Sequence, residues 1–100
     1  MNNKLRRLSY NQLIILQYLL SRQGSVVTVA EIQKHTPLKQ KALGGVLSSL
    51  SRTKFRGKSL IEPMGKALDG VGLRWKLNTD IIDVYQARKE VSSLLASYKI

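Results

Sequence analysis

The sequence contains no cysteine, one histidine, and only six acidic residues against 17 basic ones. The absence of cysteine excludes a disulfide framework, a thiolate metal site and a cysteine nucleophile. Because His35 is the only imidazole, most metal sites and catalytic triads are excluded as well. These absences argue against an enzyme, and we expect no cofactor and no small-molecule substrate.

Long hydrophobic runs are also absent. The apolar run 13–20 is eight residues long and includes Gln17 and Tyr18, so it is too short to cross a bilayer. No small-residue cleavage site follows it, and Asn11 and Gln12 interrupt its apolar character, so a secretory signal is not expected. With 100 residues, 43% of them apolar, the chain is expected to form one folded domain that does not associate with membranes.

The positive charge is concentrated in the first three quarters of the chain. The formal net charge is +11: residues 1–22 carry +4, residues 23–33 carry −1, residues 34–76 carry +8, and residues 77–100 are neutral. A charge that served only solubility would be spread evenly and mixed in sign. Its concentration favours a polyanionic partner, and we expect the bases of 34–76 to lie on one side of the molecule.

A capping box predicts the first helix. Ser9 is followed three residues later by Gln12, and the helix is expected to run to about Arg22, where Gly24 stops it. This helix is apolar on nearly every side, so we expect it at the centre of the core. Residues 25–27 are β-branched or turn-like and predict a short extended segment.

A second capping box, formed by Thr28 and Glu31, predicts a short helix that ends near His35. Thr36 and Pro37 are then expected to open a third helix over 37–53, since proline is tolerated at the first helical position. Only a tight turn would separate these two helices. The pattern predicts a helix-turn-helix corner.

The third predicted helix has an apolar and a polar side. The apolar side comprises Leu38, Ala42, Leu43, Val46, Leu47 and Leu50. The polar side comprises Gln40, Lys41, Gly44, Gly45, Ser48, Ser51 and Arg52, with no acidic residue. Each glycine costs about 1 kcal/mol relative to alanine. The pair indicates either another helix of the domain that crosses closely or a close approach by something outside it.

A basic loop over 54–58 and then a hairpin are expected after this helix. Strands are predicted over 60–64, where Pro63 indicates an edge strand, and over 71–77, where apolar and basic residues alternate. The loop 65–70 between them carries Lys66. Because Trp75 alternates with Leu73 and Leu77, we expect it in the core rather than stacked on a base.

A last helix is expected from about Asn78–Asp80 to near the end of the chain. One apolar stripe comprises Ile81, Val84, Ala87, Val91, Leu94, Leu95 and Tyr98. This surface exceeds what a small core is expected to cover, so residues 79–98 predict a homodimer. The alternative is that the helix folds back on the first helix and completes the core of a monomer.

The order of helix, short strand, helix, turn, helix and hairpin resembles the winged helix-turn-helix superfamily over about residues 8–77. The resemblance is carried by the Thr28 box, the Thr36-Pro37 pair and the hairpin that ends in 73–78. It implies an α+β fold of three helices and a β-hairpin wing, with an additional C-terminal helix. The expected organisation is a winged domain over 1–78 with a basic N-terminal arm, and an amphipathic helix over 79–100.

The resemblance also implies a third helix in the DNA major groove and a wing along the backbone or minor groove. Gln40, Lys41, Ser48 and Arg52 would face the groove, and Lys66 and Arg74 would belong to the wing. With the neighbouring bases, the expected DNA-binding residues are Lys39, Gln40, Lys41, Ser48, Arg52, Lys54, Arg56, Lys58, Lys66 and Arg74.

The expected function is therefore binding of double-stranded DNA, as a transcriptional regulator or a chromatin-associated factor. The protein would be cytoplasmic (nucleoid-associated) or nuclear, and not secreted. A winged-helix module that docks on an acidic protein partner is the alternative. Binding of single-stranded RNA is less favoured, because only 6% of the residues are aromatic.

Overall fold

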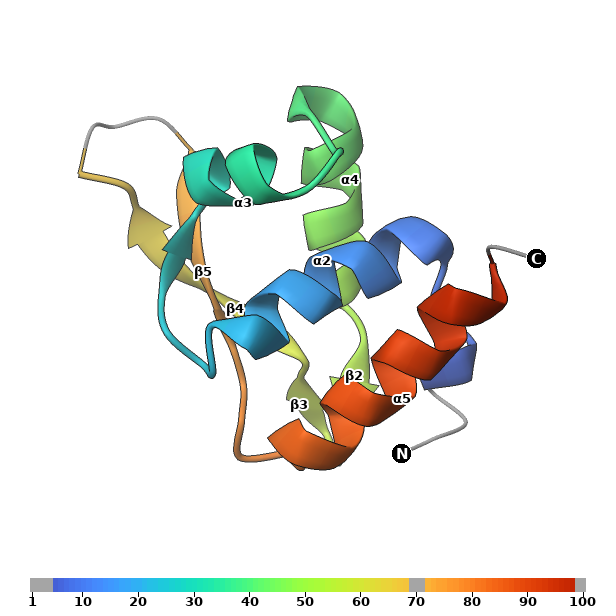
Figure 1. Cartoon of the computed structure of the whole chain (residues 1–100). Helices are drawn as coiled ribbons and strands as arrows, with labels where there is room; N and C mark the ends of the chain where they lie inside the picture. Colours follow the sequence, from blue (N-terminus) through green and yellow to red (C-terminus); the bar gives the residue numbers. More distant parts are fainter. Residues whose placement is uncertain (1–4, 69–71, 99–100) are drawn as a thin grey trace.

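Helix α2, Tyr10–Ser21, lies at the centre of the molecule (Figure 1). The computed structural model describes residues 5–68 and 72–98. The predicted capping box is present, because the Gln12 N–H donates to Ser9 Oγ at 3.2 Å and the Ser9 N–H donates to Gln12 Oε1 at 2.7 Å. The helix contacts α3, α4, α5 and β5, and it buries Leu13, Ile15, Leu16, Leu19 and Leu20. This confirms the prediction of a central helix.

The segment before α2 is not a free arm where it is described. Leu5 and Leu8 are buried, and the Leu8 N–H donates to the Leu5 carbonyl at 3.1 Å. Arg6 and Arg7 between them are exposed. Lys4, which also belongs to the expected basic arm, lies outside the described residues.

Helix α3, Val29–His35, begins with the second predicted capping box. The Glu31 N–H donates to Thr28 Oγ1 at 3.1 Å, and the Thr28 N–H donates to Glu31 Oε1 at 3.1 Å. Helix α4, Gln40–Ser51, lies across the end of α3 (Figure 1). The structure therefore contains two short helices joined by the turn 36–39.

The start of α4 corrects the prediction, because Thr36 closes α3 and does not open α4. The Thr36 hydroxyl donates to the Ile32 carbonyl at 2.8 Å and accepts from the Leu38 N–H at 3.4 Å. A threonine hydroxyl can satisfy an unpaired carbonyl at the end of a helix as well as an unpaired N–H at the start. Pro37 therefore lies in the turn, and Lys39 is the N-cap residue of α4.

The main sheet has the order β1-β5-β4 and is antiparallel. Its strands are β1, Val27–Thr28, β4, Ile61–Lys66, and β5, Leu73–Leu77. Pro63 lies in the edge strand β4, as predicted, and Trp75 is buried between Val27 and Pro63 as their strand partner. Leu73 is 39% exposed, so the expected apolar face of β5 is wrong at this position. The short strand β1 pairs only with Arg74 and Trp75 and does not extend beside Leu73.

A small hairpin occupies the segment that we expected to be a loop. It consists of β2, Lys54–Phe55, and β3, Lys58–Ser59. Arg56 and Gly57 have φ angles of 53° and 81°. Positive φ at both central residues is typical of a type I′ turn, whose twist fits a two-residue hairpin. The signal that sequence reasoning missed is Phe55, which is 3% exposed and anchors the hairpin in the core.

Helix α5, Val84–Ser97, packs against α2 (Figure 1). One apolar cluster includes Leu16 and Leu20 of α2 together with Ala87, Val91 and Leu95 of α5. The core covers most of the expected α5 stripe, because Ile81, Ala87, Val91 and Leu95 are buried, whereas Tyr98 is 53% exposed. Because α2 is apolar on nearly every side, it buries α5 on one face while it contacts α4 and β5 on others.

Candidate nucleic-acid interface

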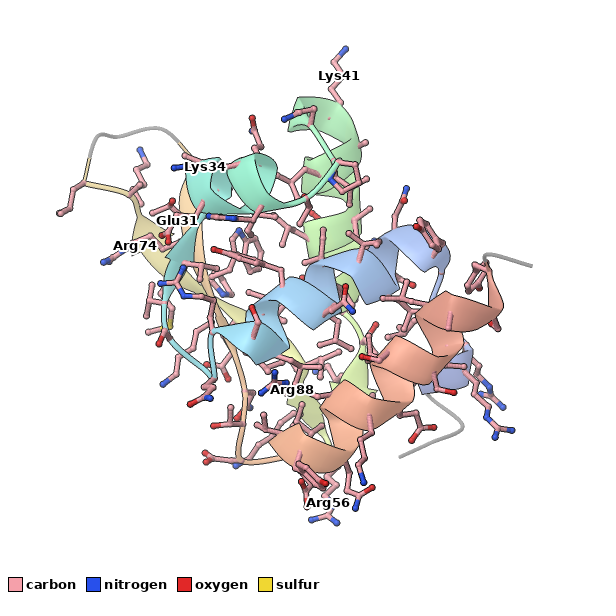
Figure 2. All side chains as sticks on the ribbon, in the orientation of Figure 1. Glu31, Lys34, Lys41, Arg56, Arg74 and Arg88 are labelled. Carbon is pink, nitrogen blue, oxygen red and sulfur yellow. The ribbon has the colours of Figure 1, made fainter. Side chains whose placement is uncertain are left out.

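Basic side chains lie on α3, on the turn that follows it, at the start of α4 and on the β4–β5 hairpin. Figure 2 shows Lys34, Lys41 and Arg74 on the side of α2 that faces away from α5. Lys39 is the N-cap residue of α4, and Lys66 is the last residue of β4. We call these five residues, Lys34, Lys39, Lys41, Lys66 and Arg74, the helix-corner region.

The outer face of α4 carries little side-chain bulk. Leu43, Leu47 and Leu50 are buried, whereas Lys41, Gly44, Gly45 and Ser48 are exposed. Ala42 is exposed too, so its assignment to the apolar side was wrong.

The position of the glycine pair decides between the two explanations given for it. A Cβ atom added at Gly44 or Gly45 would meet no atom of the described residues within 4 Å. No described element crosses α4 there, so an internal helix crossing does not explain the pair. The face is open to a partner.

The turn before α4 holds one of the predicted cations in place. Lys39 Nζ donates to the Gln33 carbonyl at 3.1 Å, which fixes the ammonium group beside α3. Gln40 is the first residue of α4, and its side chain lies outside the described residues. Lys34, which sequence reasoning left out of the site, is exposed in the last turn of α3. The sequence feature that could have identified Lys34 is its position in the last turn of the helix before the predicted helix-turn-helix corner.

Arg74 stabilises the β4–β5 hairpin. The register shifts between Pro63 and Lys66, and the Arg74 guanidinium donates from Nη2 to the Met64 carbonyl at 2.8 Å across this bulge. Its buried Nε has no hydrogen-bond partner among the described atoms. Arg74 is therefore half-buried and positions the hairpin, while Lys66 is exposed.

The remaining predicted bases lie elsewhere. Arg52, Lys54, Arg56 and Lys58 are exposed and surround the β2–β3 hairpin, and we call them the hairpin region. Figure 2 shows Arg56 at the opposite end of the molecule from Lys41. The bases of 34–76 therefore do not form one compact cluster but extend from one end of the molecule to the other. Helix α4 has 12 residues, so it is about 18 Å long, and the chain leaves its far end before the hairpin begins.

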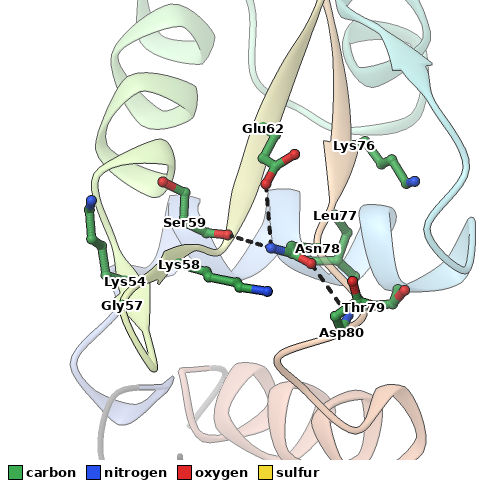
Figure 3. Close-up of a pocket in the computed structure, with 10 residues that line it drawn as sticks. All are labelled: Lys54, Gly57, Lys58, Ser59, Glu62, Lys76, Leu77, Asn78, Thr79 and Asp80. Carbon is green, nitrogen blue, oxygen red and sulfur yellow. Dashed lines mark hydrogen bonds between the residues drawn. The ribbon is translucent and has the colours of Figure 1, made fainter.

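A hollow of about 420 Å³ lies behind the β2–β3 hairpin (Figure 3). Asn78 crosses it, with Nδ2 3.4 Å from both the Ser59 carbonyl and Glu62 Oε1. Lys58 and Asp80 also line it, so basic and acidic side chains are mixed there. Arg52 and Arg56 are not part of this lining.

One ion pair joins the end of α2 to the start of α3. Arg22 Nη1 lies 2.6 Å from Glu31 Oε2, and the same nitrogen donates to the Tyr18 hydroxyl at 2.9 Å. The hydrogen bond from Arg22, with that from the Thr28 N–H, lowers the pKa of Glu31 below its usual value. The hydrogen bond to Glu31 also raises the pKa of Arg22. Glu31 is thus neutralised by a partner, and no acidic residue follows it until Glu62.

Among the residues that the structure describes, no three His, Cys, Asp or Glu side chains are grouped so that they could hold a metal ion. None of the described helices is both long enough and apolar enough to span a membrane. Comparisons with protein-family models, with curated proteins and with solved structures find no match for this chain.

Proposed function

We propose that the chain binds duplex DNA as a winged-helix protein. In this proposal α4 enters the major groove and the β4–β5 hairpin is the wing. The order α2, β1, α3, α4, β4, β5 and the sheet order β1-β5-β4 support it. The additional β2–β3 hairpin and helix α5 lie outside this arrangement.

One observation carries the proposal. Lys34 and Lys41 of the helix corner and Arg74 of the β4–β5 hairpin lie on the side of α2 away from α5, and residues 32–61, which include the helix corner, contain no acid. In this proposal Lys39 and Lys66 also contact the phosphate backbone. A concentrated basic surface on a helix-turn-helix corner is what a polyanionic duplex requires.

The side chains of α4 favour contacts to phosphate over contacts to bases. Ser48 is the only exposed polar side chain described in the middle turns of α4, since Gly44 and Gly45 have none. Phosphate contacts carry no direct sequence information. We therefore favour a chromatin-associated, weakly discriminating protein over a sequence-specific regulator.

We propose binding by a single chain. The apolar stripe of α5 packs on α2, and Tyr85 and Tyr98 are its exposed large apolar residues in the described part of the chain. Uncovered apolar surface on α5 was the argument for a homodimer through residues 79–98, and most of that surface is covered by α2. Whether the unfolding midpoint depends on protein concentration tests the homodimer directly.

The experiment is a salt titration of binding to a fluorescent duplex of random sequence, followed by anisotropy. If four of the helix-corner cations contact phosphates, the slope of log K against log salt should be about −3.6. Lys41→Gln should reduce the slope by about 0.9. Arg88→Gln removes the same charge from the exposed face of α5 and should leave the slope unchanged.

Two results would contradict the proposal. One is a slope near zero or no binding at low salt, which would favour the protein-docking alternative. The other is an equal change in slope for Lys41→Gln and Arg88→Gln, which would mean that net charge and not the helix corner determines binding.

A further inference from the structure

The hairpin region is not used by the proposed interface. Residues 52–58 contain four bases and no acid, and all four side chains are exposed. Figure 2 shows Arg56 at the end of the molecule opposite Lys41. A duplex seated on the helix corner would therefore leave Arg56, at the tip of the hairpin, facing solvent.

The hairpin is held firmly on the core. Phe55 and Leu60 are buried at either side of the turn. The Leu60 N–H donates to the Thr53 carbonyl at 2.9 Å, and the Asn78 N–H donates to the Leu60 carbonyl at 2.9 Å. The first bond extends the hairpin ladder, and the second ties it to the segment after β5. The tip is thus presented in a fixed direction.

Arg56 occupies a turn position that usually holds asparagine or glycine. Its φ of 53° is left-handed, and asparagine or glycine is the usual first central residue of a type I′ turn. Arginine here places a cation at the tip in spite of an unfavourable backbone conformation. The acidic Glu62 and Asp80 line the hollow behind the hairpin together with Lys54 and Lys58, whereas Arg56 does not line it.

We propose that the hairpin region binds the phosphate backbone of a second duplex, so that one chain bridges two DNA duplexes. This inference rests on the proposed function for the first duplex. Phosphate is the ligand that exposed cations on a short turn, here Arg56 and Lys58, can bind. The only aromatic side chain of the hairpin, Phe55, is buried, which disfavours stacking on single-stranded bases. Once the first duplex is bound, two joined binding regions raise the effective concentration for the second.

The experiment uses the full chain, a biotinylated duplex on beads and a second, fluorescent duplex of unrelated sequence. Wild-type protein should retain the fluorescent duplex at low salt. The double variant Arg56→Asn with Lys58→Gln should capture at least about tenfold less of it, because two phosphate contacts are lost. Its affinity for one duplex in solution should change by less than about twofold, since the helix corner is intact.

Two features of the design exclude loss of folding and loss of net charge as explanations for reduced capture. Arg56→Asn introduces the residue that the turn prefers, so the thermal midpoint of the variant should not fall. The control variant Arg88→Gln with Lys89→Gln removes the same charge from exposed positions of α5 and should capture the second duplex like the wild type.

Each remaining outcome overturns the inference. Binding of the first duplex without capture of the second contradicts bridging and leaves the proposed function intact, whereas no binding to the beads contradicts both. Capture that persists in the hairpin variant assigns bridging to association between chains. An equal loss of capture and of single-duplex affinity means that the hairpin belongs to the first interface.

Discussion

The helix-corner region and the hairpin region have similar charge and different construction. The first is assembled from segments distant in sequence, namely the α3–α4 turn and the two strands β4 and β5. The second is local, with four cations within residues 52–58. In the sequence they merge into one basic stretch, and α4 separates them in space. The comparison teaches that the spacing of charges along a chain does not give the number of charged surfaces.

Both regions are supported by the same core, so a substitution in that core should have the largest effect on the free energy of unfolding. Leu95 of α5 is 6% exposed and belongs to the apolar cluster that includes α2. Leu95→Ala should lower the free energy of unfolding by about 2–5 kcal/mol, because it leaves a cavity. Denaturant unfolding followed by circular dichroism and by Trp75 fluorescence should give one midpoint, independent of protein concentration.

A concentration-dependent midpoint would instead indicate a homodimer through residues 79–98. Two separate transitions would indicate that residues 79–100 form an independent unit. The exposed substitution Ser93→Ala on α5 serves as the control, and its effect should be within about 0.5 kcal/mol.

Substitution of Gly44 and Gly45 should affect the helix-corner region and not the hairpin region. Space for a methyl group is open at Gly44 and Gly45, so replacing both with alanine should stabilise α4 by about 2 kcal/mol in total. The same methyl groups would separate α4 from a duplex in the groove. Affinity for one duplex should therefore fall while stability rises, and the hairpin region should be unaffected.

Ala42→Gly provides the matched control for the glycine pair, because Ala42 is exposed on the same helix. It should lower stability by about 1 kcal/mol through helix propensity alone. An unchanged affinity in the Gly44→Ala and Gly45→Ala double variant would show that α4 does not approach DNA closely.

The smallest expected effect concerns the ion pair beside the helix corner. The pKa of Glu31 is lowered in the folded protein, so its contribution to stability is present above the unfolded value of about 4.3 and is lost as pH falls through the folded value. Glu31→Gln can keep the capping box and removes the ion pair. Because both side chains are more than a third exposed, the effect at neutral pH is small.

Chemical denaturation at pH 7 and at pH 3 checks this prediction. The wild type should be slightly more stable than Glu31→Gln at pH 7, and the difference should shrink at pH 3. A difference that stays constant with pH would assign the effect to the capping hydrogen bonds and not to the charge.

Local signals predicted much of the fold. The boxes at Ser9 and Thr28 involve hydrogen bonds between residues three apart, so the sequence alone specifies them. The edge position of Pro63 follows from its missing N–H, and the burial of Trp75 follows from strand alternation. Thr36 shows the limit of such signals, since one hydroxyl can cap the end of one helix or the start of the next.

The sequence by itself determined the α+β order of elements, the basic character of residues 34–76 and the small, acid-free face of α4. Tertiary structure decided that α2 covers α5, that no described residue covers Gly44 and Gly45, and that Lys41 and Arg56 lie at opposite ends. The reason is physical. Helix capping and strand alternation depend on residues that are close in the sequence. Burial depends on which apolar surfaces pack together across the whole chain, and this packing determines where each charged side chain lies on the surface.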